Sequence, residues 1–152
     1  MILVDRGSKH GVRRDLPVVA WGGAVGRVVS TGHSHSKVRL LNDPNSGVAG
    51  VLQRSRAQGM VVGQGEGPLG MLYVPRFADV AHGDRVVASG LDGVFPRGFG
   101  IGRVISIDEA PDGTRTIRLA PDLDYGYIEE VLILLEPWGS ELLAPDDPGE
   151  ES

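Results

Sequence analysis

The chain contains an internal repeat, and this feature constrains its fold more than any other. The two copies read HGVRRDLPVVAWGGAVGRVVS at residues 10–30 and HGDRVVASGLDGVFPRGFGIGRVIS at residues 82–106. Each copy has His-Gly, a Val-Val-Ala stretch, a glycine-rich turn and then Gly-Arg-Val-(Val/Ile)-Ser. Repetition on this scale indicates two copies of one supersecondary unit, here a β-hairpin. We expect His10-Gly11 to correspond to His82-Gly83, and Gly26 to Gly102.

The rest of the sequence also consists of short apolar or alternating segments separated by turn residues, and none sustains a helical period over three turns. Short strands at this spacing are typical of barrels and sandwiches. The sequence therefore predicts an all-β protein with two small β-barrel lobes related by the internal pseudo-repeat. The predicted strands are Ile2–Asp5, Leu16–Trp21, Ala24–Thr31, Lys37–Asn42, Val48–Arg56, Met60–Gly63, Met71–Val74, Arg85–Ser89, Gly102–Ile107, Thr114–Ala120 and Ile128–Leu135.

We expect four segments: a β-lobe with the first hairpin at residues 1–64, a linker and crossing strand at 65–80, a β-lobe with the second hairpin at 81–136, and an acidic disordered tail at 137–152. Gly67 lies in the linker, where we expect conformational freedom. Glycine and proline suit tight turns and sharp bends. We expect such structural positions at Gly7, Gly11, Gly26, Pro44, Gly90, Gly93, Pro96, Gly98 and Gly102.

Composition excludes several classes of function. There is no cysteine, so neither a disulfide framework nor a thiol nucleophile exists. The net charge of −5 comes from residues 141–152, and the remainder is balanced, which argues against a nucleic-acid partner. No apolar run is long enough for a transmembrane helix, and the charged start at Asp5 and Arg6 does not resemble a signal peptide.

Candidate catalytic and metal-binding residues have ordinary explanations. His33 and His35 could share a face of a strand, but no third ligand is near in sequence, so we expect a solvated turn and no metal. Ser46-Gly47 and Ser89-Gly90 read as turns. The glycines from Gly98 to Gly102 precede a strand instead of a helix, which does not fit a phosphate loop. We predict no catalytic residue and no cofactor. A trypsin-like β-barrel hydrolase is the alternative, followed by a small-ligand barrel, which would need an open interior.

The loop at residues 91–99 carries two aromatic residues that the first repeat lacks. It could plug the end of its barrel, or it could form an exposed binding surface. Large aromatics at the centre of an interface contribute most of the binding energy. We therefore expect partner binding through apolar contacts, with little contribution from charge. The candidate residues are Tyr73, Phe77, Phe95 and Phe99.

Several strings resemble the extracytoplasmic β-domain of the rod shape-determining protein MreC family. The resemblance covers about residues 2–135 and is most specific in GDRVVASGLDGVFPRG at residues 83–98. Other matching strings are DRGSKHGV at 5–12, PVV at 17–19, GRVV at 26–29, LNDPNS at 41–46, QRS at 53–55, VIS at 104–106 and EEVLI at 129–133.

The resemblance implies two small β-barrels, no catalytic residue and a scaffold role in the cell-elongation machinery. It implies a periplasmic or extracytoplasmic domain that binds and activates the elongation transpeptidase, a class B penicillin-binding protein, and that can self-associate. MreD, RodA, RodZ and MreB are the implied partners in the wider complex. Family members have an N-terminal membrane helix and a coiled coil. Neither is found in this sequence, so we expect a fragment excised from a membrane-anchored protein.

Overall fold

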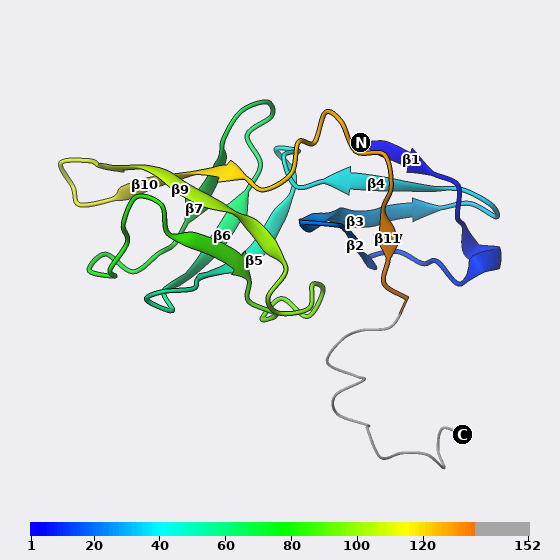
Figure 1. Ribbon diagram of the computed structural model, residues 1–152, viewed down its shortest axis with the longest axis horizontal. Coiled ribbons are helices and arrows are strands. Elements are labelled where there is room, and N and C mark those ends of the chain that lie inside the picture. Colours follow the sequence, from blue (N-terminus) through cyan, green and yellow to red (C-terminus); the bar gives the residue numbers. More distant parts are fainter. Residues whose placement is uncertain (136–152) are drawn as a thin grey trace, which may run out of the picture.

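The computed structural model describes residues 1–135, so the predicted tail lies outside the described residues. These residues form eleven strands and a short 3-10 helix, η1 (Ser8–His10). Figure 1 shows the strands gathered into two lobes that lie end to end. The all-β class and the two-lobe arrangement are confirmed.

The first lobe is a five-stranded antiparallel sheet whose two edges do not pair. Its strand order is β1-β4-β3-β2-β11, so β1 and β11 are the open edges. The bounds are β1 (Ile2–Val4), β2 (Pro17–Ala20), β3 (Gly23–Thr31), β4 (Ser36–Leu40) and β11 (Leu132–Ile133).

The second lobe is a closed six-stranded barrel with the order β10-β7-β6-β5-β8-β9. Closure pairs every edge strand, which removes the exposed backbone groups that an open sheet leaves. The bounds are β5 (Gly47–Leu52), β6 (Gln58–Val62), β7 (Leu69–Leu72), β8 (Arg85–Ala88), β9 (Gly100–Glu109) and β10 (Arg115–Pro121).

The pseudo-repeat extends beyond the predicted hairpin to three strands, because β2-β3-β4 and β8-β9-β10 have matching pairing. Val18 pairs with Gly26 and Val86 with Gly102, and in both hairpins the register shifts directly afterwards. The third strands are joined equivalently: Leu41 N–H donates to Val25 O at 2.9 Å, and Asp122 N–H donates to Ile101 O at 2.9 Å. The predicted equivalence of Gly26 and Gly102 is confirmed.

The predicted equivalence of the two His-Gly pairs is wrong. Asp15 N–H donates to Val28 O at 2.8 Å, as Gly83 N–H donates to Val104 O at 2.8 Å, so Asp15 takes the position of Gly83. Both residues have positive φ, 71° for Asp15 and 89° for Gly83. Asp tolerates this conformation better than most residues, which explains how Asp15 can occupy the position that Gly83 has in the second copy. His10 and Gly11 belong instead to the turn that contains η1.

The strand pairing differs from the predicted lobe boundaries at two places. β5 and β6, expected in the first lobe, pair with β8 and β7 in the barrel. β11, expected in the second lobe, pairs with β2 in the open sheet. The chain therefore leaves the first sheet after β4, completes the barrel and returns to the first sheet at β11.

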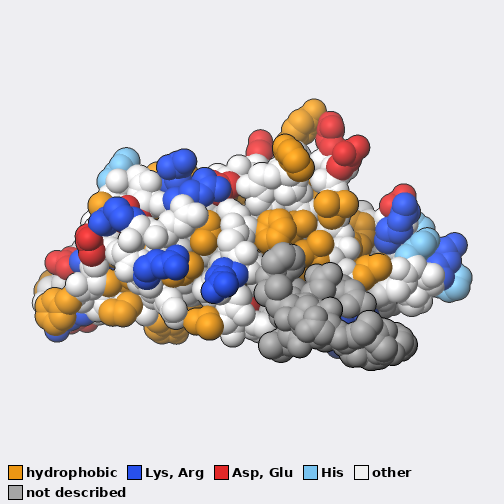
Figure 2. Space-filling model, turned by 60° about the horizontal axis from the view of Figure 1, so that its bottom comes forward, with side chains coloured by type: hydrophobic (Ala, Val, Ile, Leu, Met, Phe, Trp, Pro, Cys, Tyr) orange, Lys and Arg blue, Asp and Glu red, His pale blue; other side chains and the backbone are white. Residues whose placement is uncertain are grey.

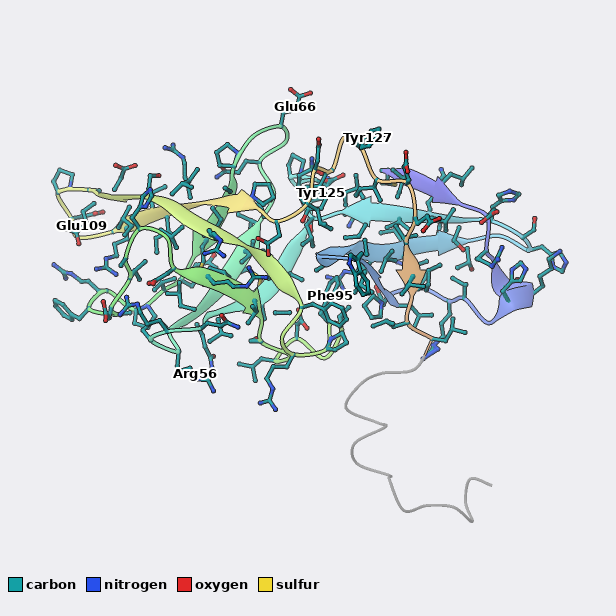
Figure 3. All side chains as sticks on the ribbon, in the orientation of Figure 1. Arg56, Glu66, Phe95, Glu109, Tyr125 and Tyr127 are labelled. Atoms are coloured by element: carbon teal, nitrogen blue, oxygen red, sulfur yellow. The ribbon has the colours of Figure 1, made fainter. Side chains whose placement is uncertain are left out.

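The loop that precedes β9 closes the end of the barrel next to the open sheet. Phe95 is only 3% exposed and belongs to the core, and Phe99 is partly buried against it. Figure 3 places Phe95 on the side of the barrel that faces the first lobe. Asp92 Oδ1 accepts from Val94 N–H at 3.0 Å, which shapes the turn. The loop therefore plugs the end of the barrel and does not form an exposed binding surface. Phe95 is not available as a binding residue.

Glycine is required at the predicted positions for two different reasons. Gly11, Gly90, Gly93 and Gly98 have φ between 75° and 101°, and Pro96 is buried beside Phe95. Gly7, Gly26 and Gly102 have other backbone angles, but a Cβ there would collide with backbone atoms of Gly32 and His33, of Arg39 and of Ala120 respectively. Pro44 lies in the β4–β5 turn. In the linker, where we expected conformational freedom, Gly67 also has a positive φ of 96°, a backbone angle that residues with a side chain rarely adopt.

We predict that Gly26→Ala and Gly102→Ala each lower the stability of the protein by about 1–3 kcal/mol, because the added methyl group must displace a carbonyl of the neighbouring strand. Gly126→Ala is the matched control, since its Cβ would lie 3.4 Å from a flexible Asp124 carboxylate and its φ is not positive. Thermal unfolding measures the difference. Melting temperatures that are equal for all three variants would contradict the steric explanation.

Candidate interaction surfaces

The clearest candidate surface is the segment after β7, residues 73–79, which we call the aromatic loop. Tyr73 is 84% exposed and Phe77 is 90% exposed. Val74 and Val80, in contrast, are partly buried against the core. The loop therefore presents two large aromatic side chains to solvent while its apolar neighbours hold it on the barrel, which makes it a candidate interaction site.

The Arg54 guanidinium fastens the aromatic loop to the barrel. Its Nε donates to Asp84 at 2.8 Å and its terminal nitrogens donate to Asp79 at 2.6 and 3.1 Å. A further terminal N–H donates to Asp84 at 2.9 Å, and Ala81 N–H donates to the same carboxylate at 2.9 Å. These bonds join the β5–β6 turn to both ends of the segment 79–84. We call this group of three side chains the Arg54 clamp.

The charges of the clamp stabilise one another. Hydrogen bonds from Arg54 lower the pKa of both Asp79 and Asp84, and those carboxylates raise the pKa of Arg54. The Asp84 side chain is only 7% exposed, so its full set of donors is what makes burial of the charge tolerable. Carboxylates with lowered pKa values occur in structural ion-pair networks as well as in active sites. Here the donors, Arg54 and the Ala81 N–H, hold the loop in place, so we assign the clamp a structural role.

Two further contacts set the shape of the aromatic loop. Arg115 donates from a terminal nitrogen to Ala78 O at 2.9 Å. Arg76 lies over the Phe77 ring, with Cζ 5.5 Å from its centroid, close enough for a cation–π contact. Tyr73 has a φ of 65°, an uncommon backbone angle for an aromatic residue. A rigid, anchored aromatic surface loses little conformational entropy when it binds a partner.

A second candidate surface is the groove between the open edges of the first lobe. It has a volume of about 940 Å³ and is lined by side chains of β1, the β2–β3 turn and residues 128–132. A smaller groove of about 360 Å³ continues from it toward η1 and shares Val4, Asp5, Val131 and Leu132. Trp21 is 99% exposed at its margin. Open strand edges can pair with an extended segment.

Sequence reasoning correctly expected Tyr73 and Phe77 to be exposed, but it placed Tyr73 in a strand, whereas β7 ends at Leu72. It also missed Arg54, Asp79, Asp84 and Trp21. Trp21 could have been found, because an aromatic residue directly before the Gly22-Gly23 turn has to lie at the tip of the hairpin. The clamp could not, since Arg54 is 25 and 30 residues away from its two partners.

The residues considered for chemistry are not brought together. His35 Nδ1 contacts the hydroxyl of its neighbour Ser34 at 3.0 Å in an exposed turn. Ser89 Oγ accepts from Leu91 N–H at 3.2 Å, a local turn bond. Within residues 1–135, no group of three or more His, Asp or Glu side chains is arranged to hold a metal ion. Among the same residues, no helix has the length and apolar character that a membrane crossing needs.

Comparison with known proteins points to one family. Residues 1–135 match the family described as rod shape-determining protein MreC, barrel core. The cell shape-determining protein MreC of Cereibacter sphaeroides is 32% identical over 97% of this chain and 47% of its own length. The corresponding protein of Caulobacter vibrioides is 36% identical over 86% of this chain and 37% of its own length. The chain thus spans less than half the length of these relatives.

Solved structures agree with this assignment. The crystal structure of MreC from Pseudomonas aeruginosa has a TM-score of 0.82 and 28% identity, and the match covers 88% of this chain and 87% of that one. A complex between the penicillin-binding protein PBP2 and MreC from Helicobacter pylori also matches, with a TM-score of 0.62 and 22% identity over 73% of this chain and 69% of that one. At that identity the second match shows the fold alone.

We predict that Asp84→Ala lowers the melting temperature clearly, because it leaves the Nε–H of Arg54 and the Ala81 N–H without their acceptor, a loss of about 1–3 kcal/mol. Asp79→Ala removes only the exposed half of the clamp and should have a smaller effect. Thermal unfolding at pH 7 compares the two variants with the parent. A larger loss from Asp79→Ala than from Asp84→Ala would contradict this account.

The same clamp predicts the direction of the acid response. Because the folded state lowers the pKa of both carboxyls below the usual 3.8, the unfolded chain takes up protons first as the pH falls. The stabilisation is therefore complete above that value and is lost as the pH falls through the lowered pKa values.

Proposed function

Because the chain belongs to the MreC family of rod shape-determining proteins, we propose that it is a non-catalytic scaffold of the cell-elongation machinery. In this role it binds a peptidoglycan transpeptidase, a class B penicillin-binding protein, outside the cytoplasmic membrane, and binding activates that enzyme. Support comes from the family match over residues 1–135 and from the Helicobacter pylori MreC that forms a complex with PBP2. The alternative of a trypsin-like hydrolase has no such support.

The observation that carries the proposal is the anchored aromatic loop. Tyr73 and Phe77 are almost fully exposed, and their supporting residues are fastened by the Arg54 clamp and Arg115. Large aromatic side chains that become buried at the centre of an interface are common hot spots of binding energy. The transpeptidase would contact these rings directly, and Arg76, which lies over the Phe77 ring, would help to hold that ring in place.

We propose that this interface depends mainly on apolar contact. Arg54 is paired with Asp79 and Asp84, and Arg115 is paired with Glu109 at 3.5 Å. Within residues 1–135, Arg76 over the Phe77 ring is then the one cation of the aromatic loop without an ion pair. Salt screens exposed charges but barely weakens apolar burial. Binding to the transpeptidase should therefore survive salt concentrations that abolish an electrostatic complex.

The wider setting follows from family membership and belongs to the same proposal. The full-length protein would be anchored in the cytoplasmic membrane by an N-terminal helix, with the two lobes outside. MreD, RodA, RodZ and, across the membrane, MreB would be partners in the wider complex, and copies of the protein could self-associate.

The test is binding of the purified chain to the extracytoplasmic domain of the elongation transpeptidase from the same organism. We predict that Phe77→Ala weakens binding at least about tenfold, and that Tyr73→Ala has a similar effect, without lowering the melting temperature. Trp21→Ala is the matched control, because Trp21 is an equally exposed aromatic on the other lobe. Calorimetry or interferometry gives the dissociation constants.

Two results would overturn the proposed surface. One is unchanged affinity in the Tyr73→Ala/Phe77→Ala double variant. The other is loss of binding in Trp21→Ala alone, which would move the interface to the groove between β1 and β11. Loss of parent binding at about 0.5 M NaCl would show that charge, and not apolar contact, holds the complex.

A further inference from the structure

Positive charge is concentrated at one end of the first lobe, although the sequence as a whole is acidic. Residues 1–42 contain seven Lys or Arg and two Asp. Figure 2 shows Lys, Arg and His side chains gathered at the end of the molecule distant from the barrel. We define the basic end by its exposed side chains: Arg6, Lys9, His10, Arg13, Arg14, His33, His35 and Lys37.

The basic end is built on two loops that are held together by the backbone. Ser8 N–H donates to Gly32 O at 2.8 Å and Lys9 N–H donates to His33 O at 3.1 Å, which docks η1 on the β3–β4 turn. Gly7 allows this approach, because a Cβ there would collide with the carbonyl of Gly32. The cations are therefore presented on a defined surface.

Few carboxylates of the described residues neutralise this surface. Asp5 pairs with Arg6 at 3.5 Å, and Asp15 pairs with Arg27 at 3.8 Å. Within residues 1–135, none of Lys9, Arg13, Arg14 and Lys37 has an ion pair. The electrostatic effect is seen at His10, whose pKa is lowered by desolvation and then by the neighbouring Arg6 and Lys9.

The chain passes directly beside the basic end where the described residues stop. A Cβ at Gly11 would lie 3.7 Å from Cδ1 of Leu135, and Leu135 lines the same small groove as Arg6 and His10. Residues 136–152 follow from this point. They contain six Asp or Glu and no Lys or Arg: Glu136, Glu141, Asp146, Asp147, Glu150 and Glu151.

We propose that residues 136–152 are an intramolecular ligand of the basic end, held there by complementary charge. An extended chain spans about 3.3 Å per residue, so residues that follow Leu135 can reach every cation of the surface. A short tether gives an effective concentration of the order of millimolar, which lets even weak ion pairs form. The tail then competes with any other anionic ligand of this surface. The inference does not depend on the proposed transpeptidase complex.

A single spin label tests the contact. The chain has no cysteine, so Ser140→Cys gives one unique site for a nitroxide. We expect the label to broaden the amide signals of Lys9, His10 and His33 strongly in about 20 mM salt and several-fold less in about 0.5 M NaCl. The amides around Tyr73 and Phe77 on the barrel are the internal reference.

Neutral variants separate charge from mere tethering. In the labelled protein with a neutral tail, the broadening should fall several-fold; that variant carries Glu136→Gln, Glu141→Gln, Asp146→Asn, Asp147→Asn, Glu150→Gln and Glu151→Gln. Arg13→Gln/Arg14→Gln should have the same effect. The matched control, Arg56→Gln/Arg97→Gln, removes two exposed barrel arginines and should change nothing.

The proposal fails if the broadening is the same in the parent and the neutral-tail variant. It also fails if anionic phosphatidylglycerol vesicles bind both proteins equally, because the basic end would then be an open lipid-binding surface. Vesicle binding by the neutral-tail variant that clearly exceeds binding by the parent supports competition by the tail.

Discussion

The architecture depends on a close backbone contact that a glycine makes in the long central strand of each lobe. At Gly26 and Gly102 a carbonyl of the next strand occupies the place of a Cβ, and the register of the preceding pair shifts directly beside it. A bulge of this kind bends a strand and increases its twist. In the barrel, β5, β6 and β7 complete the circle around this bent unit, whereas in the first lobe only β1 and β11 flank it and the sheet stays open.

The two lobes share one core, which keeps their outer surfaces at opposite ends. Tyr125 OH donates to Ala24 O at 3.2 Å across the junction, and burial raises the pKa of the Tyr125 hydroxyl. At the same junction, a Cβ at Gly23 would collide with Gly100 O. The aromatic loop lies at the barrel end, where Arg76 approaches Gly113 of the β9–β10 turn, and η1 lies at the other end (Figure 1). Apolar and electrostatic contacts could therefore be made independently.

Local sequence patterns predicted most strands and the pseudo-repeat, because hairpin turns and strand periodicity are encoded over a few residues. Local patterns do not predict long-range pairing. No local sequence pattern indicates that β11 pairs with β2 or that Arg54 binds Asp84. The aromatic residues illustrate the same limit. Phe77 and Phe95 both lie in loops between strands, yet one is exposed and the other is core, because burial depends on what the rest of the chain places around them.

The most direct test of the account is site-specific photocrosslinking from the aromatic loop. A benzophenone amino acid introduced at position 77 reacts only with atoms that touch it, and position 21 serves as the equally exposed comparison. We predict that irradiation of the complex joins position 77, and not position 21, covalently to the transpeptidase. A crosslink from position 21 with none from position 77 would contradict it.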